Sequence, residues 1–219
     1  GFVINNTANR ALTLKNCKLE NVLNAINHSK GTNTITCTLL GNGNDFGTSA
    51  TSQYAKYVLA AADATLTAPE GFNVTTSVEN SLVKYVDGAY KVVPAVAKIG
   101  DVCYETLADA IAAIGAGDVT IVLLANVSLD ITAWQTLAIG GDNTTSITID
   151  GDNGEEEDFT LTFNKLNSDW NHVATSNDNA TKLILKNLKL ADSGYNNGPW
   201  NRYDIVFASD VELTNVVSA

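Results

Sequence analysis

Thr181–Leu190, with the sequence TKLILKNLKL, decides the fold because it recurs at Ala11–Leu19 as ALTLKNCKL and at Val211–Val216 as VELTNV. In all three copies apolar residues alternate with polar ones, and one asparagine follows: Asn187, Asn16 and Asn215. Strict alternation predicts a half-buried strand, and an asparagine at a fixed place after it predicts a sharp bend. The recurrence therefore predicts a solenoid of short strands, one coil after another.

Composition agrees with β-structure and limits the expected partners. The chain has 219 residues, a hydrophobic content of 45% and a net charge of −11 at pH 7, which allows a sizeable core in one long domain or two short ones. It is rich in Thr, which suits strands, and in Asn, which suits turns. A phosphate-binding surface needs clustered Lys and Arg. Because Arg10 and Arg202 are the two arginines, we expect no nucleic acid partner.

The cysteines and the chain ends carry further expectations. Cys17, Cys37 and Cys103 cannot all pair within one chain, and their spacing fits no zinc site. Since Cys17 and Cys37 take apolar positions of strand patterns, we predict buried free thiols, with a disulfide as the alternative. No apolar run is long enough to span a membrane, so no membrane insertion is expected. The chain shows no signal peptide, starts without methionine and stops in mid-pattern, so we expect a fragment of a longer protein.

Residues 1–93 contain two strand patterns and a hairpin signal. The strands are expected at Leu12–Leu19 and Thr34–Leu40, with Leu12 and Ile35 in equivalent positions of neighbouring coils. The pair Asp87-Gly88 stands between alternating apolar residues and predicts a β-hairpin over 82–93. We interpret 1–93 as the last coils of one solenoid followed by this hairpin.

Residues 94–219 begin with a helical pattern and continue with strands. Apolar residues at 107, 110, 111 and 114, followed by Gly115, predict one short helix near 105–114. Strand patterns follow, and we expect these pairs to be equivalent from coil to coil: Ile121 with Ile147, Ile147 with Leu183, and Leu183 with Val211. We interpret 94–219 as the helix and first coils of a second solenoid, and the two arcs as able to stack into one unit.

These residues carry a resemblance to a known fold. The order Tyr104-Glu105-Thr106-Leu107, Ala110-Ile111 and then GDVTIVLL at 117–124 resembles the opening of right-handed parallel β-helix domains of the pectate-lyase-like fold, where a short helix caps the coil stack. The recurring asparagines look like that fold's asparagine ladder, with Asp150 in an equivalent place. The segment 85–101 is similar to joints in large, repetitive bacterial surface proteins with adhesin-like β-helices. The resemblance implies an all-β, right-handed parallel β-helix (β-solenoid).

Two loops contain aromatic residues among amide and carboxylate side chains. They are SDWNH at 168–172 and YNNGPWNRYD at 195–204. A sugar ring presents an apolar face and a rim of hydroxyls, which such side chains suit. The candidate glycan-binding residues are Trp170, His172, Tyr195, Trp200, Arg202 and Tyr203. The alternative is that these aromatics only cover the flank of the solenoid.

Evidence for catalysis or bound metal is thin. An enzyme of this fold acting on acidic polysaccharide needs carboxylates that hold calcium beside a basic residue, or paired aspartates in glycosidase geometry. The motifs of polygalacturonase-like members are absent, and we assign no catalytic, cofactor or metal residue. The acidic loop Asp150–Asp158 offers oxygens that Ca²⁺ prefers, but it does not follow the EF-hand order, and such runs are usually solvated. Calcium is therefore the less favoured interpretation there.

The resemblance leads to one expected function and one alternative. We expect a non-catalytic, secreted, bacterial cell-surface module, an adhesin-like β-helix that displays loops to polysaccharide or host-surface glycans. The alternative is a fragment of a polysaccharide lyase or glycoside hydrolase. An uncapped coil end is also a template for another chain. We therefore expect the arc at 11–19 to stack on the Val211–Val216 end, within the chain or in a head-to-tail or swapped self-association.

Overall fold

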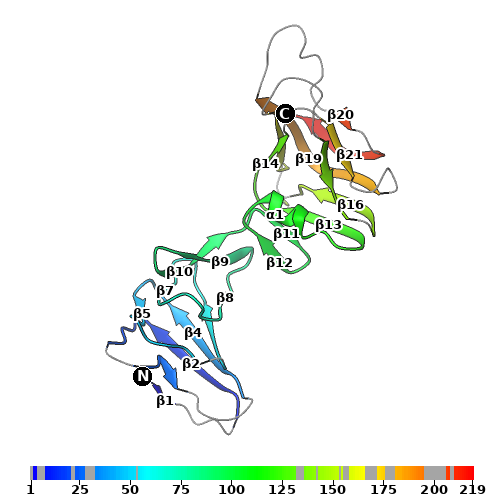
Figure 1. The fold of residues 1–219 in the computed structure, drawn as a ribbon. Coiled ribbons are helices and arrows are strands. Elements are labelled where there is room, and N and C mark those ends of the chain that lie inside the picture. Colours follow the sequence, from blue (N-terminus) through cyan, green and yellow to red (C-terminus); the bar gives the residue numbers. More distant parts are fainter. Residues whose placement is uncertain are drawn as a thin grey trace. The chain divides into compact units, whose positions relative to one another are not determined.

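The chain forms two compact units, Gly1–Pro94 and Ala95–Ala219, each with its own hydrophobic core. Figure 1 draws their elements in sequence colours. This computed structural model describes residues 2–3, 8–20, 23–27, 33–52, 54–131, 136–141, 143–152, 154, 158–165, 172–175, 181–194, 206–207 and 210–219.

The first unit is built from short strands, most of which pair in parallel. Strands β2, β4, β6 and β8 form one parallel sheet in that order, and β5 and β7 pair in parallel before the sheet continues into β10 and β9. A further parallel pair joins β1 and β3. The bounds are β1 Phe2–Val3, β2 Arg10–Lys15, β3 Ile26–Asn27, β4 Ile35–Leu40, β5 Asn44–Asp45, β6 Ala55–Leu59, β7 Thr65–Thr67, β8 Val74–Thr76, β9 Ser81–Val86 and β10 Ala89–Pro94.

Alternation of side chains explains the core of this unit. Every second residue of β4 is buried, because successive side chains of a strand point to opposite faces. Parallel pairing aligns Leu12 with Cys37 and Cys37 with Tyr57, so the inward residues form columns across the sheet. Phe46 and Phe72 pack against the buried Tyr57 ring, with centroid distances of 5.8 and 5.1 Å. Buried Leu, Phe and Tyr side chains therefore make up much of the core of the first unit.

The hairpin predicted from Asp87-Gly88 is confirmed. Strands β9 and β10 pair antiparallel, with Val86 opposite Ala89. The two turn residues have φ values of 54° and 78°. A two-residue hairpin turn of this kind needs positive φ at both positions, which Asp tolerates and Gly adopts freely.

The second unit contains the remaining strands and one short helix. The bounds are β11 Ala97–Ile99, β12 Val102–Tyr104, α1 Leu107–Ala112, β13 Gly117–Leu123, β14 Val127–Ile131, β15 Thr136–Ile139, β16 Thr144–Asp150, β17 Thr160–Lys165, β18 His172–Thr175, β19 Lys182–Gly194, β20 Val206–Phe207 and β21 Val211–Ser218. Parallel pairs run from β13 to β16, β19 and β21, and from β14 to β17 and the second half of β19. A third parallel set joins β15, β18 and β20.

Inward residues of the second unit also form columns. Ile121, Ile149, Leu185 and Leu213 occupy paired positions of β13, β16, β19 and β21. The first three are fully buried, whereas Leu213 is 54% exposed. Because β21 is an edge strand of its sheet in the described part of the chain, its inward residue is covered from one side only. The core of this unit is thus open at β21.

Thr106 caps the N-terminus of helix α1. The Thr106 hydroxyl accepts a hydrogen bond from the Asp109 N–H at 3.0 Å and donates one to the Asp109 carboxylate at 2.6 Å. A capping side chain of this kind satisfies a backbone donor that the first helical turn leaves unpaired. Leu107 and Ala110 are buried in the core of the unit. Helix α1 thus lies within the predicted segment 105–114.

The all-β prediction and its parallel sheets are confirmed, while the closed winding of a β-helix stays a prediction, because none of the described sheets closes on itself. Two expected registers were wrong by two residues. Leu12 pairs with Cys37 rather than Ile35, and Ile121 with Ile149 rather than Ile147. The other two, from Ile147 to Leu183 and from Leu183 to Val211, are correct. A two-residue slip keeps every side chain on its own face, so alternation alone does not distinguish these registers.

The three cysteines are free, as predicted for Cys17 and Cys37. Cys37 is fully buried, whereas Cys17 is only half-buried, which corrects the expectation of burial for both. Cys17 lies on the edge arc after β2, where the described chain provides a neighbour on one side only. Burial, with a smaller contribution from nearby Cys17, raises the pKa of Cys37 to about 12, so this thiol stays protonated and unreactive at neutral pH.

Candidate functional site

Three segments outside the described residues each join two strands of the second unit. They are 132–135 between β14 and β15, 166–171 between β17 and β18, and 195–205 between β19 and β20. At their starting ends Ile131 pairs with Lys165, and Lys165 with Gly194. At their finishing ends Thr136 pairs with His172, and His172 with Val206. The parallel registers therefore bring the ends of all three connections together at adjacent positions of adjacent strands.

The candidate glycan-binding residues belong to these connections by sequence. His172 is the first residue of β18. The other five lie outside the described residues: Trp170, Tyr195, Trp200, Arg202 and Tyr203. The second connection contains Trp170, and the third contains the remaining four. The structure thus fixes the strand ends that carry these segments.

Sequence reasoning missed one residue of the same kind. Trp134 stands in the first connection, 132–135, so each of the three connections contains one of the three tryptophans of the protein. The sequence pattern that could have identified Trp134 is the recurrence of one tryptophan per coil, each in the connection that leads into β15, β18 or β20. It was not recognised because β14, β15 and β18 were not predicted as strands.

A ladder of polar side chains runs beside the buried columns. The Asn187 Nδ2 donates to Asp150 Oδ1 at 3.0 Å, and the Asn215 Nδ2 donates to Asn187 Oδ1 at 3.0 Å. The backbone φ values of Asn187 and Asn215 are 48° and 53°, which matches the predicted bend. The chain also passes very close here, because a Cβ on Gly151 would lie 2.6 Å from the Asn187 carbonyl oxygen. Glycine is therefore required after Asp150.

The first position of this ladder is an ionised carboxylate. Burial, the largest effect, raises the pKa of Asp150, but hydrogen bonds from Asn187, Lys186 and the Asp152 N–H outweigh it and hold the pKa below its ordinary value. The Lys186 ammonium lies 3.0 Å from Asp150 Oδ2, and the Asp150 side chain is 17% exposed. The Asp150 carboxylate is thus held by hydrogen bonds and an ion pair within the second unit.

The acidic loop after β16 shows turn geometry in its described residues. The Asp152 carboxylate accepts a hydrogen bond from the Gly154 N–H at 2.8 Å, while Asp150 serves the ladder. Residue 153 and residues 155–157 lie outside the described part. Within the described part, no three His, Cys, Asp or Glu side chains gather as a metal site would require. Calcium at Asp150–Asp158 stays the less favoured interpretation.

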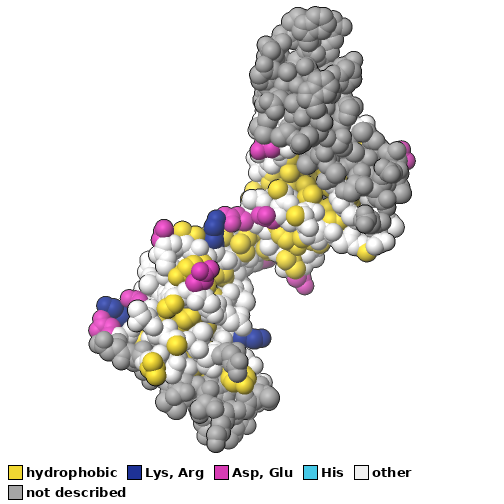
Figure 2. Space-filling view, viewed as in Figure 1, with side chains coloured by type: hydrophobic (Ala, Val, Ile, Leu, Met, Phe, Trp, Pro, Cys, Tyr) yellow, Lys and Arg dark blue, Asp and Glu magenta, His cyan; other side chains and the backbone are white. Residues whose placement is uncertain are grey.

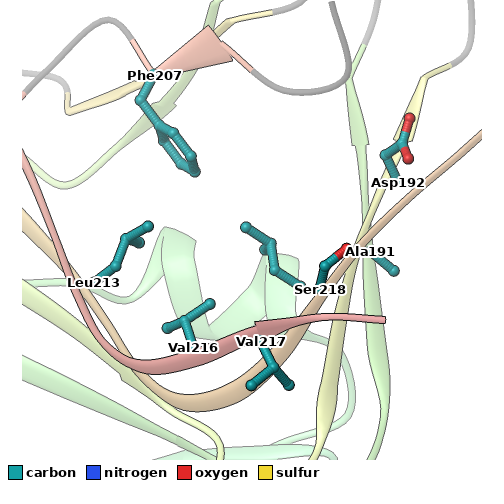
Figure 3. Close-up of a pocket in the computed structure, with 8 residues that line it drawn as sticks. Ala191, Asp192, Phe207, Leu213, Val216, Val217 and Ser218 are labelled. Atoms are coloured by element: carbon teal, nitrogen blue, oxygen red, sulfur yellow. The ribbon is translucent and has the colours of Figure 1, made fainter.

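A hollow of about 350 Å³ lies at the open end of the second unit. Its lining includes Leu190, Asp192, Phe207, Leu213, Val216 and Ser218. Figure 3 shows Phe207 and Leu213 on opposite sides of the hollow, and Val217 on the other face of β21. Because Leu213 continues a buried column, the hollow is the uncovered end of the hydrophobic core.

Acidic side chains outnumber basic ones on the face of the molecule in view (Figure 2). Figure 2 shows acidic side chains scattered over the viewed face and few Lys or Arg side chains among them. Within the described ranges, no helix has the length and apolar character needed to cross a membrane. Comparisons with protein families, curated proteins and solved structures gave no match for the chain.

Proposed function

We propose that the chain is a non-catalytic, extracellular β-solenoid module that binds glycans through the three connections at 132–135, 166–171 and 195–205. The observation that carries this proposal is the pairing of strand ends, which gathers the termini of all three connections at adjacent positions. Each connection brings one tryptophan. The proposal places the module at the surface of a bacterial cell, as an adhesin-like segment.

The strand order supports a solenoid. In the second unit the chain passes through a strand of each parallel set in turn, as in β13, β14 and β15, and then repeats the order with β16, β17 and β18. Long β19 supplies two sets before β20, and β21 again pairs with both halves of β19. Crossovers between parallel strands are right-handed in nearly all proteins. A right-handed coil with three faces per turn accounts for this order.

The residues of the connections support recognition of a sugar. Tryptophan and tyrosine rings stack on the apolar face of a pyranose, and Asn, Asp and Arg side chains bind its hydroxyls. Tyr195, Trp200, Arg202 and Tyr203 supply both kinds of group within one connection. His172, at the first position of β18, lies beside the end of that connection because it pairs with Val206. Successive coils would then present one aromatic ring each to a linear polysaccharide.

The runner-up, a polysaccharide lyase or glycoside hydrolase fragment, needs a different arrangement. A retaining or inverting hydrolase needs two carboxylates about 5–10 Å apart beside the sugar. Asp150 is a partly buried carboxylate of the described residues, and it is bound to Asn187 and Lys186. Its pKa is lowered from the ordinary value, not raised. A general acid requires the opposite shift. Asp150 is therefore a structural residue in our proposal.

Intrinsic fluorescence tests the proposal directly, because all three tryptophans lie in the proposed binding connections. We expect acidic or neutral bacterial and host polysaccharides on a glycan array to yield binders that change the emission of the wild-type chain. Trp170→Ala and Trp200→Ala should each weaken such binding about tenfold, since stacking on one aromatic ring is worth about 1–1.5 kcal/mol. The circular dichroism spectrum should stay unchanged.

Leu23→Ala is a matched control, because Leu23 is an 85% exposed hydrophobic residue of the first unit. It should bind glycan as the wild type does. Binding that survives both tryptophan substitutions, or an array with no binder, contradicts the proposal. Release of reducing or unsaturated sugar from a bound polysaccharide would favour the enzyme instead.

A further inference from the structure

We propose that the open end of the second unit at β21 binds the β2 edge of a second copy, so that chains stack head to tail. In this contact Arg10–Lys15 of one copy adds as the next parallel strand after Val211–Ser218 of another. Three features support this contact: the hydrogen-bonding phase of the two edges, the polarity of the asparagine ladder and the hollow at the end of the core.

Both strands are sheet edges in the part of the chain that the structure describes. Strand β21 pairs with β19, and β2 pairs with β4, and neither has a second described neighbour. An edge of this kind presents a row of unpaired N–H and C=O groups. On β21 the edge is also apolar, with Leu213 54% and Val217 55% exposed.

The phase of the free backbone groups follows from the bonds already made. Arg10 and Asn16 donate their N–H groups to β4, at Thr34 and Leu40, so even-numbered residues of β2 face β4. Ala11, Thr13 and Lys15 therefore face the open edge, because alternate residues of a parallel strand bond to opposite neighbours.

The same reasoning applies to β21. The Leu183 N–H donates to the Asp210 carbonyl at 3.0 Å, so the even-numbered residues of β21 before the bend at Asn215 face β19. Val211 and Leu213 face the open edge. When Asn215 is aligned with Asn16 of the second copy, Leu213 lies opposite Leu14. The Leu213 N–H then meets the Thr13 carbonyl, and the Lys15 N–H meets the Leu213 carbonyl. This is the pattern by which Leu183 and Val211 already pair.

The asparagine ladder has a direction that this alignment continues. Along the stack each Nδ2 donates to the preceding Oδ1, from Asn187 to Asp150 and from Asn215 to Asn187. The Asn16 Oδ1 accepts from the Gly43 N–H at 3.0 Å. Within the described part of the chain, the Asn16 Nδ2 and the Asn215 Oδ1 have no hydrogen-bond partner. They are the donor and the acceptor that the next step of the ladder requires.

The asparagine backbones also match. Asn16 has a φ of 52° and Asn215 a φ of 53°, so both strands bend at the aligned residue. After the bend Cys17 lies opposite Val216. Leu14 and Cys17 would therefore cover Leu213 and Val216 at the mouth of the hollow. On the outer face Lys15 falls diagonally beside Glu212, which adds an attraction between charges of opposite sign.

The contact uses different surfaces of the two copies. Such a heterologous contact leaves one free β2 edge and one free β21 end on every assembly, so growth does not stop at a dimer unless the rotation closes a ring. Assemblies should therefore lengthen as the concentration of the chain rises.

Sedimentation velocity of the full chain at increasing concentration tests this contact. The wild type should show a weight-average mass that rises past twice the monomer mass. Leu213→Lys places a charge on the edge, and Asn16→Asp removes the Nδ2 donor while keeping the oxygen that Gly43 needs and a side chain tolerated at positive φ. Both variants should stay monomeric. Val102→Lys is the control, since Val102 is 57% exposed on the edge strand β12, and it should assemble as the wild type does.

A mixture of the two variants gives a sharper result. The Asn16→Asp copy keeps an intact β21 end, and the Leu213→Lys copy keeps an intact β2 edge, so one productive contact forms between them. The equimolar mixture should reach twice the monomer mass and no more, although each variant alone stays monomeric. The proposal is overturned by a wild type that is monomeric throughout, by a mixture without dimers, or by equal loss of assembly in Val102→Lys. If Leu213→Lys fails to fold, monomeric wild type or assembly of Asn16→Asp still refutes it.

Discussion

Asn187 serves the fold through both its backbone and its side chain. Its φ of 48° turns the long strand β19 between two faces, and its amide bonds to Asp150 on one side and Asn215 on the other. The sequence predicted this bend because asparagine tolerates left-handed backbone and recurs at the same place. The resemblance to an asparagine ladder also placed Asn215 and Asp150 in equivalent positions, and the structure adds the hydrogen bonds that join them to Asn187.

Two substitutions separate these roles. Asn187→Gly keeps the backbone conformation and loses both side-chain bonds, so we expect the free energy of unfolding to fall by about 1–2 kcal/mol. Asn187→Leu should cost roughly 1–2 kcal/mol more, because a leucine is strained at positive φ. Urea titration of both variants measures the difference. Equal midpoints for Asn187→Leu and the wild type would mean that the ladder does not stabilise the unit.

Acid should weaken the second unit through Asp150. The folded state holds the pKa of this carboxyl below its ordinary value, so its contribution to stability is complete at neutral pH and is lost as the pH falls through the folded pKa. Asp150→Asn keeps an oxygen for the Asn187 amide but cannot titrate. Below about pH 4, the ordinary range for an aspartate, we expect the unfolding free energy of Asp150→Asn to fall less steeply with decreasing pH than that of the wild type.

The comparison is made by urea unfolding at several pH values. The pKa values of Asp118 and Glu212 are also lowered, by hydrogen bonds from Thr145 and Lys182 respectively, and both remain in the variant. The part of the pH dependence of the unfolding free energy that comes from Asp118 and Glu212 should therefore persist in Asp150→Asn. Identical pH profiles for the two proteins would show that Asp150 does not contribute.

At the scale of elements, strand identity was easier to predict than strand partners. The alternation in β4 and β19 was read correctly, and the two registers that failed did so by one full period. A slip of two residues changes no inward residue to an outward one, so only packing of particular side chains selects the register. The two correct registers are those of β19 with its neighbours β16 and β21.

Elements of four residues or fewer were largely missed. Strands β15 and β18 have four residues each and were not predicted. Strands this short are stabilised by their parallel neighbours rather than by their own sequence pattern. The same omission hid the relation between the three tryptophan-bearing connections, because that relation is visible only when the flanking strands are known. The amino-acid composition of the segments thus identified the candidate binding residues. The pairing of the flanking strands showed that their segments begin and end at neighbouring positions.

At the scale of the whole molecule, two separate cores predict two separable unfolding events. Leu39 in the first unit and Leu185 in the second are fully buried. Replacing either by alanine should cost about 2–5 kcal/mol. In dilute solution, Leu39→Ala should speed hydrogen exchange at β2, β4 and β6, and Leu185→Ala at β13, β16 and β19. Faster exchange throughout both units in either variant would mean that the chain unfolds as one cooperative body.

The parallel register also governs how quickly such a chain can fold. Val119 pairs with Ile147, and Ile147 with Leu183, partners that stand 28 and 36 residues apart. Each pairing must first close a long loop, so refolding from denaturant should be slow, with unpaired edges exposed meanwhile. A ribosome adding about 5–20 residues per second supplies each new strand only about 1–7 seconds after its partner. Synthesis from the N-terminus therefore delivers strands in the order in which they stack, and a nascent chain meets fewer wrong partners than a denatured one.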